Sequence, residues 1–411
     1  MYSRFIFVFF WICVAVGVLF ILRPVLYATV QQPSDEKRAR EIVLKYGQNS
    51  ASYLALEKDK SLYFGEHTEG VIAYGVVDNC LIVQADPICA DEDFIPFLSE
   101  FNMFCRENDY HLLFMSTSDK YLEEYKKMGF VHVKCGEEAR IDLSTYQLAG
   151  GKMARLRPEI NHAVKKGVTV AEYKPLEQKD VEIERGIAAV TDDWLGGKKS
   201  SQLCFSVGDV NLDHPMDRRY FYAKDESGRI VAFNVFLPFE GKKGWMADVT
   251  RRSHDAPRGS TEKITFDAFM QFKEEGCLWG SMGVSPLANI EGEENEKTTI
   301  GRILKLVYEK GNRFYGFKSL HLAKEKYSPS QWIPSYFVYS KKAINIDMGI
   351  AIVKLQNPGG FADFFTSFFT KTVLKKDKKK TKTDNKNPAK EQNTDKVKAD
   401  VQNKTEKSEQ V

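Results

Sequence analysis

The stretch "GWMADVTRRSHDAPRGSTEKITFDAF", from Gly244 to Phe269, joins an apolar segment to an amphipathic one through a highly charged turn. The apolar segment contains one acid, Asp248. The charged or titratable residues of the turn are Arg251, Arg252, His254 and Asp255. Apolar residues then recur with helical spacing over 261–276, which predicts a helix there. A buried strand, a turn and a helix in this order are typical of an α/β protein.

This turn has the features of an anion-binding site. Backbone N–H groups at the start of a helix lack partners, and the helix dipole is positive there. Arg252 and Arg258 add positive charge, while Gly259 and Ser260 stand where the helix begins. Asp248 has two interpretations: a salt-bridge partner of the arginines or a general base. Nearby arginines should lower the pKa of this acid, which favours the charged acceptor form.

The segments on either side of the turn repeat one scheme. The β-like stretches "GVIAYGVV" and "CLIVQA" precede a predicted helix at about 93–108. In the second half, a predicted helix at 182–194 precedes a hairpin with a "DESG" turn, and strand and helix then alternate. The pattern predicts a mixed sheet flanked by helices, built twice, in domains at 40–147 and 168–345.

The segment between these domains, 148–167, is predicted to be a basic linker helix. Its sequence is "LAGGKMARLRPEINHAVKKG", and its basic residues include Lys152, Arg155, Arg157, Lys165 and Lys166. Such a run is either a solvated linker or a contact for a polyanion, such as nucleic acid or lipid headgroups.

Two segments near the end of the second domain also carry polar groups. "SMGVSPLANI" (281–290) is small and polar after a buried strand, as expected where a sheet opens onto a site. "AKEKYSPSQWIPSYFVY" (323–339) contains Lys324 and Lys326, which have no obvious role on a helix face. The sequence has no GxSxG, HExxH, P-loop or GxGxxG motif, so serine-hydrolase, zincin, kinase and Rossmann chemistry are not indicated. No metal site is predicted.

The net charge and the cysteine content indicate where the basic residues lie and which redox environment suits the protein. The formal net charge is +3, but residues 371–411 hold 13 Lys against 7 Asp and Glu, which leaves the preceding residues at −3. The basic character therefore lies mostly in the last segment. The 7 cysteines are scattered without a CxxC pair, which fits a reduced, cytoplasmic environment.

The two end segments differ from the body. Residues 5–22 are uncharged and mostly bulky and apolar, which predicts a transmembrane anchor within 1–30. More Lys and Arg follow this segment than precede it, so we expect a single-pass protein with a cytoplasmic body. Over 358–374, phenylalanines at helical spacing precede lysines and predict an amphipathic helix, docked either on the membrane or on the protein. The Lys-rich tail, 375–411, is predicted to be disordered.

The ordered set "GEEARIDL", "RLRPEINHAVKKGVTV", "DDWL", "GRIVAFNVF", "ADVTRR…DAPRGS", "MGVSPLAN" and "KEKYSP" closely resembles the catalytic domain of bacterial phosphatidylglycerol lysyltransferases. The resemblance covers about 61–339. It implies an α/β protein with tandem GNAT-like (acyl-CoA N-acyltransferase-like) domains joined by the basic helix. It also implies transfer of an aminoacyl group, with lysyl expected, from aminoacyl-tRNA to a glycerol hydroxyl of phosphatidylglycerol, which reduces the negative charge of the membrane.

The resemblance assigns active-site roles to Asp248 and Arg251. Asp248 would accept the proton of the lipid hydroxyl, and Arg251 with Lys324 or Lys326 would stabilise the oxyanion. Phosphate would bind at four residues: Arg252, Arg258, Gly259 and Ser260. Asp192 or Asp193 would pair with the amino group of the amino acid, unless its role is structural. Because aminoacyl-tRNA already holds an activated ester, no cofactor is expected.

Departures from the family pattern keep alternatives open. Longer members carry a multi-helix membrane region that moves the lipid across the bilayer, so a separate flippase would be needed here. Ser200, Ser201 and Gln202 stand where the family usually has an acid, which leaves the choice of amino acid open. The alternatives are an acyl-CoA N-acyltransferase, a tRNA-dependent transferase of cell-wall precursors, and a non-catalytic membrane-bound adaptor for RNA or lipid.

Overall fold

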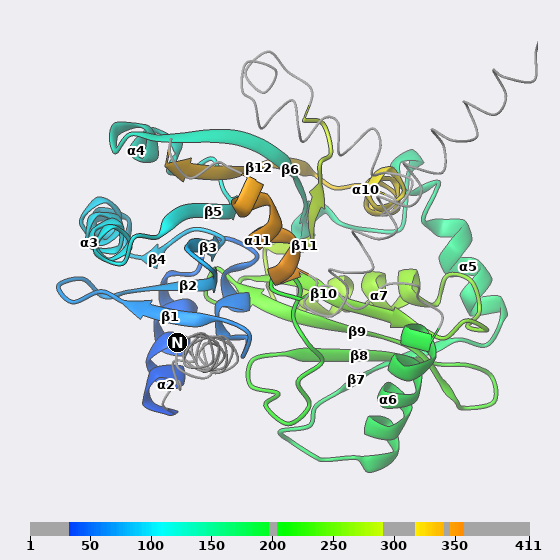
Figure 1. Ribbon diagram of the computed structural model, residues 1–411. Helices are drawn as coiled ribbons and strands as arrows, with labels where there is room; N and C mark the ends of the chain where they lie inside the picture. The colour runs from blue at the N-terminus through cyan, green and yellow to red at the C-terminus, as the bar shows by residue number, and fades with distance from the viewer. Residues whose placement is uncertain (1–32, 197–203, 291–316, 341–345, 357–411) are drawn as a thin grey trace, which may run out of the picture. The chain divides into compact units, whose positions relative to one another are not determined.

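The computed structural model describes residues 33–196, 204–290, 317–340 and 346–356 (Figure 1). The predicted anchor (1–30), the predicted amphipathic helix (358–374) and the Lys-rich tail (375–411) lie outside these residues. In the described part of the chain, no helix is long and apolar enough to cross a membrane.

One sheet of 12 strands organises the described residues, in the order β1-β2-β3-β5-β12-β6-β11-β10-β9-β8-β7, with β4 paired to β2. Its strands are β1 Ser61–Phe64, β2 Gly70–Val77, β3 Cys80–Gln84, β4 Ile88–Cys89, β5 His111–Thr117, β6 Phe130–Asp142, β7 Thr169–Tyr173, β8 Arg219–Lys224, β9 Ile230–Phe239, β10 Gly244–Arg252, β11 Trp279–Pro286 and β12 Gln331–Ser340. Most neighbours are antiparallel. Two pairs of neighbours, β3 with β5 and β10 with β11, are parallel.

Helices cover both faces of the sheet. The α-helices are α2 Pro33–Tyr46, α3 Phe94–Glu107, α4 Leu122–Lys127, α5 Arg157–Lys165, α6 Val181–Gly196, α7 Ser260–Glu274, α10 Phe317–Glu325 and α11 Ile346–Gln356, and short 3-10 turns include η1 Ser52–Leu56 and η4 Gly151–Met153. On β9, Phe236 packs in a cluster with α5 and α7, whereas Leu237 packs with α2 and η1. On β3, Val83 packs with α3 and Ile82 with α11. Because side chains alternate along a strand, α2, η1, α6 and α11 share one face, and α3, α5 and α7 share the other.

The structure confirms the mixed α/β class and most predicted elements. The predicted helices at 93–108, 182–194 and 261–276 appear as α3, α6 and α7, and the "DESG" hairpin appears as β8 and β9. Within the predicted linker (148–167), only η4 and the 9-residue α5 are helical.

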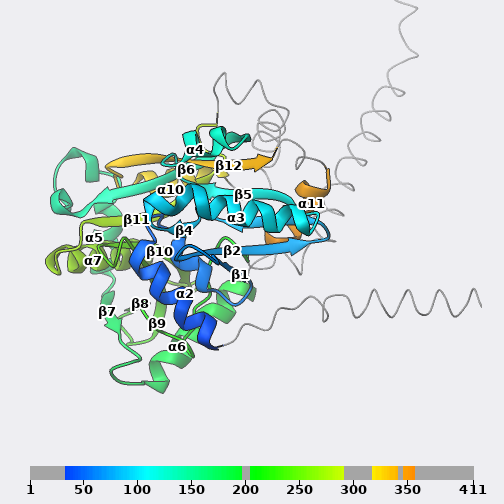
Figure 2. The ribbon, with the colours of Figure 1, turned by 90° about the vertical axis from the view of Figure 1, so that its left-hand side faces the viewer.

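The two halves of the sequence share the sheet rather than building one each. β12 comes late in the chain but lies between β5 and β6 of the first half, and β6 in turn pairs with β11 of the second (Figures 1 and 2). The boundaries at 147 and 168 stay a prediction about sequence units. In the sheet, the pairing of β12 with β5 and β6 and of β6 with β11 joins these two units.

Candidate functional site

Strands β10 and β11 separate part of the way along their length. They pair in parallel only from Gly244↔Trp279 to Met246↔Ser281. Beyond that point β10 continues to Arg252 beside β9, and β11 continues to Pro286 beside β6. The carboxyl ends of two parallel strands therefore diverge, which is where ligands bind in many α/β proteins.

A β-bulge in β10 places Asp248 at this opening. Ala247 pairs with Phe236 and Val249 with Val235, so Asp248 is an extra residue without a partner in the ladder. Bulges of this kind re-aim side chains next to active sites. In a regular strand, residues three apart point to opposite faces. The extra residue shifts the alternation, so that Asp248 and Arg251 share the face covered by η1 and α6.

Asp248 lies against a tight loop from the second half. The Gly208 N–H donates to both carboxylate oxygens, at 3.0 Å and 3.3 Å. A Cβ at Gly208 would lie 2.4 Å from Asp248 Oδ2 and 2.8 Å from Glu57 Oε1. A larger residue at this position would displace one or both carboxylates, and the second carboxylate lies close to the first.

Burial raises the pKa of Asp248 to about 7. The Gly208 N–H opposes this effect, the negative charge of Glu57 adds to it, and two cations, Arg218 and Lys60, oppose it. The lowered pKa expected from the neighbouring arginines is therefore wrong. Burial outweighs the opposing charges, and Arg258 of the turn pairs with Glu159 instead of Asp248. A carboxyl group that titrates near neutral pH is well matched to general acid–base catalysis.

Arg251 is buried beside α6, with only 3 % of its surface exposed. Its Nη1 donates to Thr191 Oγ1 at 3.1 Å, and its guanidinium lies 5.1 Å from the ring centre of Trp194. Burial lowers the pKa of Arg251, while the charges of Asp209 and Asp248 raise it. The bulge puts Arg251 and Asp248, the two residues predicted to be catalytic, on one face of β10, and the charge of Asp248 raises the pKa of Arg251.

Lys324 reaches the same opening from α10. Its Nζ donates to the carbonyl of Val284 at 2.7 Å. A Cβ at Gly283 would lie 3.8 Å from this Nζ and 3.6 Å from the sulfur of Met246, the last residue of β10 that pairs with β11. Burial lowers the pKa of Lys324 to about 7, and the charge of Glu138 opposes this effect. The amine is therefore poised between its charged and neutral forms.

Lys326 lies elsewhere. Its ammonium pairs with Glu262 in the first turn of α7. The sequence left open which of the two lysines faces the site, and the structure places Lys324 there.

The start of α7 is built for packing. Gly259 has a φ of +88°, and a Cβ there would lie 2.0 Å from the carbonyl oxygen of Glu159 in α5. Arg258 donates to both oxygens of the same Glu159, at 2.6 Å and 2.7 Å. Ser260 is buried and donates to the carbonyl of Pro257. These three residues join α7 to α5 or cap α7. Arg252 and Arg258 are both exposed, and Arg258 is the one paired with Glu159. Phosphate binding at this turn stays a prediction.

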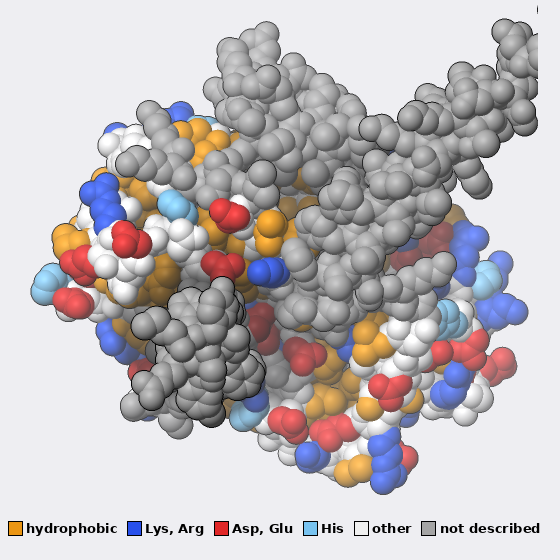
Figure 3. All heavy atoms as spheres, viewed as in Figure 1, with side chains coloured by type: hydrophobic (Ala, Val, Ile, Leu, Met, Phe, Trp, Pro, Cys, Tyr) orange, Lys and Arg blue, Asp and Glu red, His pale blue; other side chains and the backbone are white. Residues whose placement is uncertain are grey.

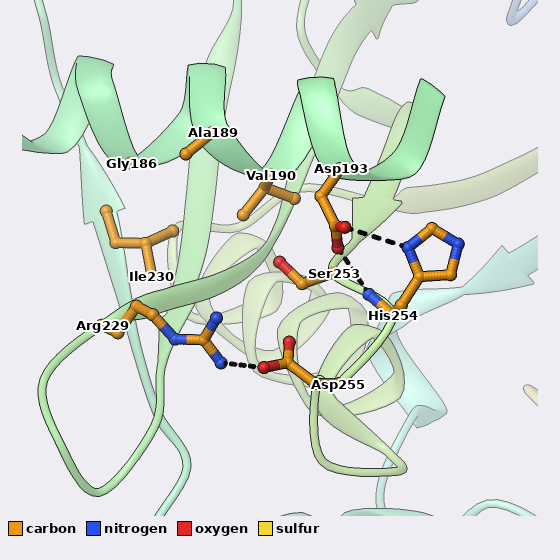
Figure 4. Close-up of a pocket in the computed structure, with 9 residues that line it drawn as sticks. All are labelled: Gly186, Ala189, Val190, Asp193, Arg229, Ile230, Ser253, His254 and Asp255. Carbon is orange, nitrogen blue, oxygen red and sulfur yellow. Dashed lines mark hydrogen bonds and ion pairs between the residues drawn. The ribbon is translucent and has the colours of Figure 1, made fainter. Parts of the chain in front are cut away.

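Asp193 lines a pocket of about 330 Å³ between α6 and the loop after β10 (Figure 4). Its carboxylate accepts the His254 backbone N–H at 2.7 Å and lies 3.1 Å from His254 Nδ1. The bond from the His254 backbone is the main cause of the lowered pKa of Asp193. Arg229 and Asp255 form a second ion pair at the rim, at 2.8 Å. Asp193 therefore fixes the loop, and its pairing with a substrate amine stays a prediction.

The basic linker residues divide into two groups. Arg157 donates to the carbonyls of Leu148 and Gly150, and Arg155 pairs with Glu325 at 2.7 Å. Lys152, Lys165 and Lys166 are exposed. Lys and Arg side chains gather over α5 in the space-filling view (Figure 3). These exposed lysines are accessible to a polyanion, and the contact itself stays a prediction.

Four residues of the site were missed from the sequence: Glu57, Lys60, Gly208 and Arg218. Each lies far from Asp248 in the chain, so no local pattern connects it to this acid. Among the described residues, no group of three or more His, Cys, Asp or Glu side chains is placed to hold a metal ion.

An acid, a buried guanidinium and a buried amine lie where the parallel strands β10 and β11 part, and acid–base and oxyanion chemistry uses groups of these kinds. The family model for the C-terminal part of phosphatidylglycerol lysyltransferase matches residues 40–339, and this chain belongs to that family.

Relatives and solved structures agree with this assignment. The phosphatidylglycerol lysyltransferase of Bacillus subtilis (strain 168) is 29% identical over 341 residues, which cover 82% of this chain and 39% of that protein. The one from Staphylococcus epidermidis is 29% identical over 338 residues, covering 81% and 40%. The chain thus spans about two-fifths of the length of these relatives.

Two solved structures share the fold. The C-terminal DUF2156 domain from Agrobacterium fabrum is 28% identical, with a TM-score of 0.68 over 79% of this chain and 98% of that one. L-PGS from Bacillus licheniformis is 26% identical, with a TM-score of 0.68 over 79% and 96%.

Proposed function

We propose that this protein transfers an aminoacyl group, with lysyl expected, from aminoacyl-tRNA to a glycerol hydroxyl of phosphatidylglycerol. The observation that carries the proposal is the opening between β10 and β11: Asp248, with a pKa of about 7, shares a face of β10 with Arg251, and Lys324 lies at β11 where the strands part. The name of the relatives supplies the lipid acceptor, because they are phosphatidylglycerol lysyltransferases. The chain would thereby reduce the negative charge of its membrane.

The chemistry needs one proton acceptor and one cationic group. Asp248, in its ionised form, accepts the proton of the lipid hydroxyl as the oxygen attacks the ester carbonyl. Arg251 and Lys324 stabilise the negative charge that develops on the carbonyl oxygen. The bond between this carbon and the tRNA ribose oxygen then breaks, and the ribose oxygen takes up the proton that Asp248 accepted, which returns Asp248 to its ionised form. The ester of aminoacyl-tRNA is already activated, so the proposal includes no cofactor.

The remaining parts of the proposal concern fold and partners. Each half contributes one parallel strand pair, β3/β5 and β10/β11, which supports a tandem GNAT-like arrangement. The exposed lysines, Lys152, Lys165 and Lys166, would contact the tRNA or anionic lipid. A single-pass anchor within residues 1–30 would hold the body on the cytoplasmic side of the cell membrane.

Thin-layer chromatography of lipids tests the proposal. The chain and its Asp248→Asn variant are expressed in a host that lacks aminoacyl lipids. We expect a new ninhydrin-positive phospholipid with the wild type and none with the variant, and hydrolysis of this lipid identifies the amino acid. If the folded, membrane-bound wild type yields no such lipid, the proposed acceptor is wrong.

A further inference from the structure

The segment Cys204–Arg218, which we call the strap, precedes β8 and lies against Asp248. Its Gly208 supplies the backbone N–H that holds the carboxylate. The strap contains three non-glycine residues with positive φ, namely Phe205 (65°), Asn211 (51°) and Asp217 (59°). Such conformations cost energy and persist only where the surroundings enforce them.

The first half of the chain supplies these surroundings. Asp59 accepts the Phe205 N–H at 2.7 Å, and Tyr53 donates to the carbonyl of Met216 at 2.6 Å. Asp217, whose side chain is 3% exposed, accepts from Arg40 Nη2 at 2.8 Å. The strap is thus fixed at its start and its end by the residues around η1 and α2.

Glu57 binds the middle and the end of the strap. Its Oε2 accepts from Asn211 Nδ2 at 2.7 Å, and its Oε1 accepts from Arg218 Nη2 at 2.8 Å. The Glu57 and Arg218 side chains are only 6% and 5% exposed, so this ion pair is buried. Since Gly208 lies between the Glu57 and Asp248 carboxylates, Glu57 contacts the strap at the point where the strap holds the acid.

Four charged groups act on Asp248 or respond to it. Glu57 follows η1, Lys60 precedes β1, Arg218 ends the strap, and Arg251 belongs to β10 itself. Lys60 has a fully buried side chain that pairs with Asp59 at 2.6 Å. Only Glu57 among the four is negative. Its charge favours the protonated form of Asp248, and the cations favour the ionised form.

We propose that Glu57 is a positioning residue for Asp248: it fixes the strap that holds this acid, and it places a second carboxylate beside it. The first half of the chain then completes the site of the second. This inference rests on the proposed function, since Asp248 must be the proton acceptor for its position to matter. Removing the charge of Glu57 should make Asp248 a stronger acid, and removing that of Arg218 should make it a weaker one.

The test is the pH profile of transfer by the full-length chain in phosphatidylglycerol vesicles with aminoacyl-tRNA. We expect the acidic limb of the profile to move down by about one pH unit in Glu57→Gln and up in Arg218→Gln. Glu57→Asp keeps the charge, so its limb should stay near that of the wild type at a reduced rate. The matched control is Asp217→Asn, which removes another buried carboxylate from the strap but does not face Asp248, and its limb should not move.

Two results would overturn the inference. One is a Glu57→Gln profile whose limb coincides with that of the wild type. The other is an equal limb shift in Asp217→Asn. If Glu57→Gln does not fold, the double variant Glu57→Gln/Arg218→Gln, which leaves no unpaired buried charge, replaces it. Its limb must differ from that of Arg218→Gln alone, or the inference fails. A wild type without transfer activity contradicts the proposed function instead.

Discussion

The parallel strand pairs β3/β5 and β10/β11 occupy corresponding places in the two halves, yet only one of them opens. The last paired residues are Gln84↔Met115 in the first and Met246↔Ser281 in the second. In each case an acid follows two residues later, Asp86 after β3 and Asp248 in β10.

The surroundings of the two acids differ. Asp86 accepts from Asn49 Nδ2 at 2.9 Å and from the Ser118 N–H at 3.0 Å and 3.2 Å. The Ala85 N–H bonds the carbonyl of Met115 at 2.7 Å, which holds β3 and β5 together past the end of the ladder. Burial raises the pKa of both acids. A buried acid is therefore not enough for a site, which also requires the strands to part.

The largest expected effect is a difference in transfer rate between variants of the two acids, Asp248 and Asp86. Asp248→Asn should lower the transfer rate by about 10³-fold, since a general base contributes between 10² and 10⁴. Asp86→Asn is the matched control and should change the rate per folded molecule less than about threefold, because Asp86 is enclosed by its own partners. Initial rates with purified chains in vesicles measure both. Equal losses would show that the comparison misassigns the site.

Stability against pH sharpens the comparison further. The folded-state pKa of Asp248 is about 7, well above the ~3.9 of an unfolded chain, so the folded state binds more protons in this window. The contribution of Asp248 to the free energy of unfolding therefore falls as pH rises from about 4 to 7, by up to roughly 4 kcal/mol. Asp248→Asn should gain stability over the wild type across this range. Chemical denaturation at several pH values measures the difference, and a pH-independent difference would contradict the raised pKa.

The two lysines of α10 and its following turn allow a second contrast within the active half. Lys324→Met should lower transfer by about 10²-fold, as removal of one oxyanion donor does in other enzymes. Lys326→Met, whose native ammonium pairs with Glu262, should change the rate less than about threefold. Transfer rates, normalised to folded protein by circular dichroism, measure the contrast. A larger loss from Lys326→Met would mean that the site extends toward α7.

The smallest expected effect concerns Asp86 beside the β3/β5 pair, whose strands stay together. Asp86→Ala leaves the Ser118 N–H without its acceptor, so the free energy of unfolding should fall by about 1–3 kcal/mol. The activity of the folded fraction should stay at the wild-type level. Urea unfolding followed by tryptophan fluorescence measures the loss. Unchanged stability would mean that these bonds do not hold the pair closed.

Local sequence patterns predicted the elements of the site but not its surroundings. The strand, turn and helix around Asp248 are readable because they depend on neighbours in the chain; α7 begins at Ser260, one residue before the predicted start. The bulge is not readable, because Trp245 to Val249 is apolar on both sides of Asp248 and hides the change of alternation. The pairing of Arg218 with Glu57 joins residues 161 positions apart, and no local pattern encodes it.

The pKa of Asp248 shows the same limit. The sequence displays the arginines beside it but not the burial that outweighs them. Likewise, the spacing of Lys324 and Lys326 does not reveal which lysine faces the opening. Side chains two residues apart diverge, and only the packing of α10 on β11 decides between them.

Because β12 lies between two strands of the first half, the sheet can be completed only late in the synthesis of the chain. Strand β12 pairs with β5, where Thr117 bonds Tyr336 across 219 positions of sequence. At about 5–20 residues per second, a ribosome needs roughly 10–40 s to make the intervening chain. Throughout that interval β5 and β6 have edges without their native partner, and such edges invite pairing with other chains. The nascent first half therefore has to be shielded or to pair reversibly until residue 340 emerges.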